Sequence, residues 1–182
     1  MHRVRGPEGT VKARASKRSK GRPAIVLARP DTPALVDAAR DLFREYAASL
    51  DVDLCFQDFE AEVRDLPGVY APPGGQLLLA TVDGVLAGCG AMRALDDVDC
   101  ANACEMKRLY VRPAFRGLGL GRLIAEALLD EARRAGYSAM LLDTLDDMES
   151  ARGLYARLGF EEIPPYYFNP IPGAHYLKAE LK

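Results

Sequence analysis

The sequence predicts an α/β fold, in which a central mixed but mostly antiparallel sheet is flanked by helices on both faces. Two observations lead to this prediction. Two apolar runs flank Asp83-Gly84, a favoured pair for a two-residue hairpin turn, and a hairpin joins antiparallel strands. Residues 105–144 then show a strand, a helix and a strand in succession, which requires a parallel crossover in one sheet. Both kinds of strand pairing are therefore expected.

Hydrophobic periodicity assigns the individual elements. In chain order it predicts a strand at 24–28, a helix from Asp31 to about residue 50, a helix at 57–66, a hairpin at 76–95, a strand at 104–111, a helix from Leu120 to Gly136, a strand at 137–144, a helix at 146–159, and strands at 160–163 and 174–181. The expected N-caps are Asp31 for the first helix and Asp146 or Asp147 for the last. Gly136 and Gly159 are expected to end their helices.

The length and composition fit one domain at residues 23–182, preceded by a basic tail. The chain has 182 residues, enough for one sizeable core. Residues 1–22 carry eight Arg and Lys against one Glu and almost no large apolar residues, so burial cannot offset the entropy of ordering them. We expect a disordered tail, either a solvated extension or the product of a start codon assigned too far upstream. An arm that binds nucleic acid is the less favoured interpretation.

The sequence carries no signal for a membrane, a secretory route or a metal. No apolar run approaches the roughly 18 residues that a spanning helix needs, and the N-terminus lacks the apolar core of a secretory signal. We therefore expect a cytoplasmic protein without a membrane partner. Cys100 and Cys104 have a spacing that suggests zinc, but a second cysteine pair is missing and both histidines lie near the chain ends. Reduced thiols and no metal are expected.

A glycine-rich turn between a strand and a helix is the strongest functional signal. Gly117, Gly119 and Gly121 follow Arg116 and alternate with leucines. A helix N-terminus has unpaired N–H groups and partial positive charge, and glycines leave these N–H groups open to a phosphate or pyrophosphate. A tight turn without a ligand is the alternative, but such a turn would need only one or two glycines.

Known phosphate-binding patterns fit this turn to different degrees. The P-loop pattern GxxxxGK(S/T) is absent. The dinucleotide pattern GxGxxG nearly fits, with Asp143 in the place of the ribose-binding acid, and this would predict a nicotinamide-dependent oxidoreductase. However, Ile124 stands where the third glycine is required, and the turn follows a three-strand meander. The dinucleotide interpretation is therefore weak.

The segment from Arg116 to Gly121 also has the form Arg/Gln-x-x-Gly-x-Gly/Ala. With "LYVRP" before it and "LYARLGF" about thirty residues after it, this segment resembles the GCN5-related N-acetyltransferase (GNAT) superfamily. The resemblance runs from Ala24 to the C-terminus. The segments "DLCFQDFEAE" and "YYFNPIPGA" further resemble a bacterial GNAT subgroup that acts on small acceptors. The resemblance implies the GNAT-like acyl-CoA acyltransferase fold, with a splayed parallel strand pair in the middle of the sheet.

The resemblance also implies acetyl-CoA as co-substrate and assigns residues to it. The turn holds the pyrophosphate, and the strand before it pairs with the pantetheine arm. These cofactor residues are Arg116, Gly117, Leu118, Gly119, Leu120, Gly121 and Arg122 in the turn, and Leu109, Tyr110 and Val111 in the strand. Many relatives have an asparagine where this chain has Met148, which removes one expected cofactor contact.

Acetyl transfer to an amine requires a proton acceptor, a donor to the developing oxyanion and a proton donor for the thiolate. An N–H group near Val111 would serve the oxyanion. The resemblance assigns Tyr155 as the donor to the thiolate; its spacing alone also fits a core aromatic. Glu105 is our candidate base, directly or through water, and strict alternation places it on one face with Lys107 and Leu109. A carboxylate paired with Lys or Arg is the equal alternative for Glu105.

Several features bear on the acceptor. The resemblance implies that the first two helices and the C-terminal hairpin form its site. Tyr166, Tyr167, Phe168 and Tyr176 lie among four prolines, and we interpret them either as a wall for a small ligand or as packing within the domain. Acidic residues near the second helix mildly favour a cationic amine, namely Asp51, Asp53, Asp58 and Glu60.

We expect the primary amine of a small molecule or of an amino-acid-like acceptor rather than a protein, and a homodimer stays open. A non-catalytic acyl-CoA-binding sensor, with the basic tail as its partner-binding arm, is the alternative function. Both functions need the glycine turn, but only the enzyme needs Tyr155.

Overall fold

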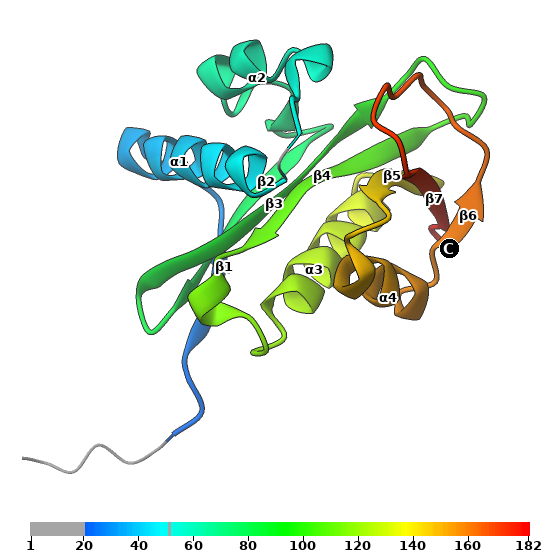
Figure 1. Ribbon diagram of the computed structural model, residues 1–182. Helices are drawn as coiled ribbons and strands as arrows, with labels where there is room; N and C mark the ends of the chain where they lie inside the picture. Colours follow the sequence, from blue (N-terminus) through cyan, green and yellow to red (C-terminus); the bar gives the residue numbers. More distant parts are fainter. Residues whose placement is uncertain (1–20, 51) are drawn as a thin grey trace, which may run out of the picture.

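The computed structural model describes residues 21–50 and 52–182. A seven-stranded sheet with the order β1-β2-β3-β4-β5-β7-β6 forms its centre (Figure 1). The strands are β1 (Ile25–Ala28), β2 (Gln76–Val82), β3 (Val85–Leu95), β4 (Ala103–Val111), β5 (Ala139–Leu145), β6 (Glu161–Ile163) and β7 (Ala174–Glu180). Among the strands of the described residues only β4 and β5 pair in parallel, so the predicted mixed, mostly antiparallel sheet is confirmed. The predicted basic tail lies outside the described residues, except for residues 21 and 22.

Helices cover both faces of the sheet, as predicted (Figure 1). They are α1 (Pro33–Ser49), α2 (Phe59–Asp65), α3 (Leu120–Arg134) and α4 (Glu149–Arg157). On one face, Phe43 of α1 and Val63 of α2 pack in a core with Leu79. On the other, Ile124 of α3 and Tyr155 of α4 share a core with the strands. None of the helices in this part of the chain has the length and apolar character that crossing a bilayer requires.

The predicted hairpin turn is confirmed by its backbone. Asp83 has φ 49° and Gly84 has φ 81°, and a type I′ turn needs positive φ at both central residues. The Asp83 carboxylate also accepts a hydrogen bond from the N–H of Ala24, at 2.9 Å. This bond fastens the start of β1 to the tip of the hairpin.

The structure corrects two predicted N-caps. Thr32, not Asp31, caps α1: its hydroxyl accepts a 3.3 Å hydrogen bond from the N–H of Leu35. Pro33 occupies the first helical position, where its missing N–H costs nothing, and this sets the cap one residue later than predicted. At α4 the N-cap is Met148, without a side-chain bond, while Asp146 binds His175 instead.

A β-bulge in β4 overturns the expectation that Glu105, Lys107 and Leu109 share a face. The register passes from Cys89 opposite Tyr110 to Ala91 opposite Lys107, so two residues of β4 oppose one of β3. Arg108 takes up the extra residue with φ 57°, which an L-residue rarely adopts. Leu109 consequently packs in the core beneath α3, while Tyr110 packs on the α1 side. A period of two cannot anticipate such an insertion.

The parallel strands β4 and β5 stay together for only part of their length. They pair from Ala103 to Glu105 of β4 with Ala139 to Leu141 of β5, yet β4 runs on to Val111 and β5 to Leu145. The splayed central pair that the resemblance implied is therefore present. The two strands diverge in Figure 1 toward the end of the sheet at which α3 begins.

Candidate active site

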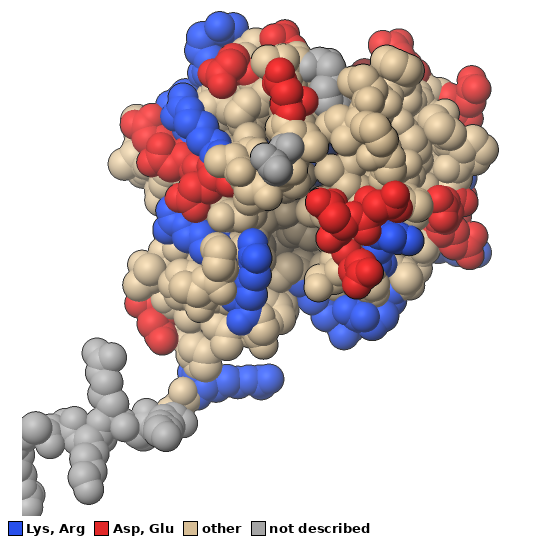
Figure 2. Space-filling model, in the orientation of Figure 1, with Lys and Arg blue, Asp and Glu red and all other residues tan. Residues whose placement is uncertain are grey.

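A narrow slot separates the diverging ends of β4 and β5. Its enclosed space is about 40 Å³, and its walls include Leu109 from β4, Thr144 from β5, and Met148 and Tyr155 from the segment of α4. Between the strand ends the surface is hollowed in Figure 2. Over this stretch the edge of β4 that faces β5 has no strand partner within the described residues, and its peptide groups are available to a ligand.

The glycine turn leads from β4 into α3 and holds a run of unused donors. Gly117 and Gly119 have φ 82° and 79°, with open space where a side chain would begin. The first hydrogen bond of α3 runs from the N–H of Leu123 to Gly119. From Gly117 to Arg122, the N–H groups have no partner among the described residues, and such a row at a helix N-terminus suits a pyrophosphate.

The two arginines and the three glycines of the turn differ in how well they suit pyrophosphate binding. The Arg116 guanidinium folds back and donates to the Val111 carbonyl at 3.0 Å, and Arg122 pairs with Glu126 at 2.7 Å. Gly121 lies in the first turn of α3, and a Cβ there would meet only Leu154 and Val111 at ordinary distances. Backbone conformation therefore requires glycine at positions 117 and 119 but not at 121.

Tyr155, the predicted proton donor, lies at the wall of the slot, and its role stays a prediction. Its side chain is 6% exposed, and its ring packs edge-on against Phe160 at 5.6 Å. Burial, followed by the electrostatic effects of Tyr46 and then Asp143, raises the pKa of the Tyr155 phenol, so the group stays protonated. Within residues 21–50 and 52–182 its hydroxyl makes no hydrogen bond. A protonated, unengaged hydroxyl in the slot can donate to a ligand.

Glu105 is buried and already engaged by its neighbours. Arg93 donates to one carboxylate oxygen through Nε at 2.9 Å and Nη2 at 2.8 Å. Tyr166 donates to the other oxygen at 2.8 Å, and Lys107 Nζ lies 3.8 Å from it. The carboxylate is 1% exposed. These contacts favour an anchoring role for Glu105, and its role as a base stays a prediction.

A larger cleft adjoins the slot on the α2 side of the sheet. Its volume is about 560 Å³, and its walls come from the segment before α2, the end of β3, β4 and the loop before β7. Tyr166 and Tyr167 form one wall, and the ring of each lies edge-on to Tyr176, at 5.4 and 5.5 Å between ring centroids. The predicted aromatic segment thus both packs on itself and borders a cavity, whereas Phe168 is 84% exposed.

A polar network joins the cleft to the slot. Tyr167 donates to Asp143 at 2.8 Å, and Asn169 contacts both of them at 3.2–3.4 Å. The Gln57 amide donates to the Tyr167 hydroxyl at 3.2 Å. Burial, followed by the charge of Asp143, raises the pKa of Tyr167, so its proton stays available for Asp143. The network holds the end of β5 and the aromatic wall of the cleft in a fixed arrangement.

Sequence reasoning missed Gln57, Lys107 and Arg108 as residues of this site. The available signal was "EMKRLYV", in which three charged residues interrupt an apolar strand, because charged residues are almost never fully buried unless they are paired. Gln57 offered no such signal.

In the described part of the chain, no three His, Cys, Asp or Glu side chains are grouped as metal ligands would be; Cys104 is buried and contacts the Ala139 carbonyl.

Comparisons with known proteins agree with this geometry. The acetyltransferase (GNAT) family model matches residues 34–160. An uncharacterized N-acetyltransferase of Schizosaccharomyces pombe is 40% identical over 150 residues, covering 82% of this chain and 90% of that protein. N-acetylaspartate synthetase of Rattus norvegicus is 32% identical over 120 residues, covering 65% of this chain and 39% of that protein. Relatives occur in bacteria as well as in eukaryotes, so the bacterial small-acceptor subgroup stays a prediction.

Among solved structures, the Salmonella typhimurium protein yncA was determined with its cofactor acetyl-CoA. It matches with a TM-score of 0.60 and 23% identity, covering 89% of this chain and 95% of that one. At this identity the match supports the fold alone. The fold class and the enzyme class predicted from the sequence are both confirmed by these findings taken together.

Proposed function

This chain belongs to the acetyltransferase (GNAT) family and is an N-acetyltransferase, and we propose that it transfers the acetyl group of acetyl-CoA to the primary amine of a small molecule. Direct attack by the amine, with both substrates bound, is the proposed route. The single observation that carries the proposal is the slot: diverging strands, a row of free N–H groups at one end and a protonated tyrosine in its wall.

The residues present fit acetyl-CoA. The N–H groups from Gly117 to Arg122 would hold its pyrophosphate, and the free edge of β4 from Leu109 to Val111 would hold the pantetheine arm. When bound, acetyl-CoA supplies an activated acetyl group: the amine nitrogen bonds to the acetyl carbon, the carbon–sulfur bond breaks, and one proton passes overall from nitrogen to sulfur. Met148 fills the position of the expected asparagine and accepts a contact from Thr144 at 3.7 Å, so it offers the cofactor only an apolar thioether.

Groups of the chain itself would donate the proton to sulfur, stabilise the oxyanion and remove the proton from the amine. Tyr155 holds a proton in the slot and donates it to the leaving sulfur. Backbone N–H groups near Val111 face the position of the reacting carbonyl and stabilise its developing charge. The proton that leaves the amine passes through the polar groups and water of the cleft. Glu105 was predicted as the base, but both of its oxygens already accept hydrogen bonds, so we assign it an anchoring role.

The size and position of the cleft support a small acceptor. About 560 Å³ is the volume of a typical small-molecule site, and the cleft opens to the slot beside Lys107. A relative named N-acetylaspartate synthetase also acts, by its name, on a small molecule. These observations favour a small amine over a protein chain.

A thiol-reagent assay of CoA release, run with acetyl-CoA across a panel of small amines, tests the proposal. We expect turnover with at least one amine and its loss in the Tyr155→Phe variant. Saturable binding of CoA without turnover on any amine would instead support a non-catalytic acyl-CoA sensor. A thermal shift with NAD but none with CoA would overturn the cofactor assignment.

A further inference from the structure

The slot and the cleft meet at three side chains. Gln57, Lys107 and Arg108 are the residues that line both spaces. An acceptor in the cleft can reach a thioester in the slot only across this junction. Polar groups at the junction that lack partners therefore indicate which chemical groups the acceptor brings.

Lys107 presents an ammonium group with unused donors. Its side chain is 8% exposed, and its Nζ lies 3.8 Å from Glu105 and 3.8 Å from Asp143, beyond hydrogen-bond distance. Its two neighbouring cations are differently placed: Arg93 is hydrogen-bonded to Glu105, and Arg108 makes a bidentate pair with Glu62. In the described part of the chain Lys107 is thus a buried cation whose charge is balanced but whose three donors are free. A carboxylate is the ligand group that such donors bind best.

Gln57 presents the complementary group. Its Oε1 atom is fully buried and has no hydrogen-bond partner among the described residues. The amide orientation is fixed by its other end, because Nε2 donates to Tyr167, whose own proton goes to Asp143. A buried acceptor without a donor is costly, and an N–H group from a ligand would satisfy it.

The charged residues that line the cleft also favour a ligand that carries both an ammonium group and a carboxylate. Asp58, Asp96 and Asp97 add negative charge to its lining and form no ion pair with any described residue, whereas Lys107 lies where the cleft meets the slot. An acceptor with an ammonium group is attracted by the acidic residues, and its carboxylate finds Lys107 at the junction. A zwitterion meets both requirements, because its ammonium group suits the net negative lining and its carboxylate can pair with Lys107.

Resting on the proposed function, we infer that the acceptor is an α-amino acid, with its carboxylate bound by Lys107 and its amino group by Gln57 Oε1. An α-amino acid is the smallest acceptor that carries both groups. The amino group then lies at the junction with the slot, where acetyl transfer must occur. The side chain extends into the cleft between Tyr166 and Tyr167 on one wall and the end of β3 on another.

Matched acceptors test this inference on the unmodified full chain. The standard L-amino acids are assayed with acetyl-CoA by CoA release, and the best of them is compared with its primary amide and its decarboxylated amine. We expect kcat/KM for the amino acid to exceed both by about 10- to 100-fold, the range for a charge-assisted hydrogen bond. Equal or better turnover of the amide and the amine overturns the inference but leaves the proposed function standing. Absence of turnover on every acceptor overturns both.

Substitutions assign the preference to a residue. In Lys107→Gln the ratio between the amino acid and its amide should fall to near one, whereas Lys107→Arg, which keeps the charge, should retain most of it. Lys178→Gln is the matched control, since Lys178 pairs with Glu180 at 2.6 Å and does not line the cleft. Acetyl-CoA binding by calorimetry reports whether each variant is folded. An unchanged ratio in folded Lys107→Gln contradicts the inference.

Discussion

At the scale of single residues, Tyr155 presents beside the slot a hydroxyl that makes no hydrogen bond with the described residues. We predict that Tyr155→Phe lowers kcat by about 100-fold or more, the usual contribution of a positioned acid, and leaves acetyl-CoA affinity unchanged. The ring and its packing on Phe160 are kept, so the thermal midpoint should hardly move. Steady-state kinetics and calorimetry measure the two effects.

A second tyrosine supplies the control for this prediction. Tyr137 donates to the Gly74 carbonyl at 2.7 Å and does not line the slot. Tyr137→Phe should therefore leave kcat unaltered. Unimpaired turnover in Tyr155→Phe would remove the donor role.

Glu105 differs from Tyr155 in that both of its carboxylate oxygens already accept hydrogen bonds. Because Arg93 and Tyr166 already donate to it, we predict that Glu105→Gln raises KM and lowers stability while the acid limb of the pH–rate profile persists. Removing the negative partner leaves Arg93 without its ion pair and Lys107 with Asp143 alone. Kinetics from pH 5 to pH 9 measure the limb. Its disappearance would instead establish Glu105 as the base.

At the scale of elements, the glycine turn depends on backbone conformation rather than on space. We predict that Gly119→Val lowers CoA affinity by about tenfold or more, since a β-branched residue at φ 79° is strained and displaces the N–H groups. Gly136→Val is the matched control: Gly136 has φ 84° and equally open surroundings, but it follows the other end of α3.

Calorimetry with CoA, combined with thermal unfolding, separates the two variants. Both should lose comparable stability, because both impose the same left-handed strain. Only Gly119→Val should lose affinity. Equal affinities in the two variants would show that the turn does not hold the pyrophosphate.

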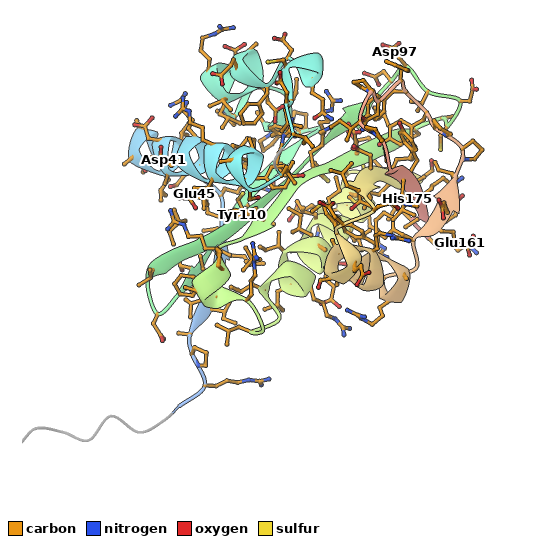
Figure 3. The ribbon with its side chains drawn as sticks, in the orientation of Figure 1. Asp41, Glu45, Asp97, Tyr110, Glu161 and His175 are labelled. Carbon is orange, nitrogen blue, oxygen red and sulfur yellow. The ribbon has the colours of Figure 1, made fainter. Side chains whose placement is uncertain are left out.

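His175 fastens the segment before α4 to β6 and β7. Its Nδ1 contacts Glu162 at 2.8 Å, its Nε2 contacts Asp146, and Arg152 approaches Asp146 at 3.9 Å; Figure 3 shows His175 beside α4. The hydrogen bonds to Asp146 and then Glu162 raise the pKa of His175 above its ordinary value of 6.5. The charged form is therefore favoured by folding.

The sign of this shift predicts a pH dependence. A raised folded pKa contributes stability that is fully present below pH 6.5 and is lost as the pH rises through the folded pKa. We predict that His175→Gln flattens the fall in unfolding free energy over this interval, measured by urea denaturation at several pH values. The other histidine of the chain, His2, lies outside the described residues. A slope unchanged by the substitution would contradict the prediction.

Periodicity, turn chemistry and glycine placement predicted the order and kind of these elements, because each depends on local sequence. The bulge at Arg108 and the cap at Thr32 depend on neighbours that a period cannot describe, and they were missed or misplaced. The cofactor turn was recognisable because its chemistry is contiguous from Arg116 to Arg122. The acceptor cleft was not, since it joins residues from before α2, from β3 and β4, and from the loop before β7.

At the scale of the whole molecule, the sheet consists of two halves that share only a three-residue parallel ladder. Side chains bridge the gap: Tyr166 from the second half donates to Glu105, and Tyr167 links Asp143 to Gln57. The same groups border the acceptor cleft. We therefore interpret the cleft network as what holds the two halves at the separation that the slot requires.

The helical layer above the first half is held by ion pairs as well as by its core. Glu45 of α1 pairs with Arg112 just beyond β4 at 2.7 Å, and Glu45 and Tyr110 lie on facing elements in Figure 3. Glu62 of α2 makes the more buried pair with Arg108 at 2.6 Å, where Arg108 also lies 5.2 Å from the ring of Phe59. Removal of Glu62 would leave a buried guanidinium without its partner.

We predict that Glu62→Gln lowers the free energy of unfolding by about 3–5 kcal/mol at pH 7, the usual cost of breaking a buried pair. Burial alone would raise the pKa of Glu62, but the hydrogen bonds and charge of Arg108 outweigh it and lower the pKa below 4.5. The contribution is thus present above pH 4.5 and is lost as the pH falls through the folded pKa.

Glu60→Gln, an exposed position on the same helix, is the matched control and should change stability little. Denaturant titrations between pH 3 and pH 7 should show the two variants diverging from each other as the pH rises. Parallel curves would mean that the layer is held by its apolar core alone.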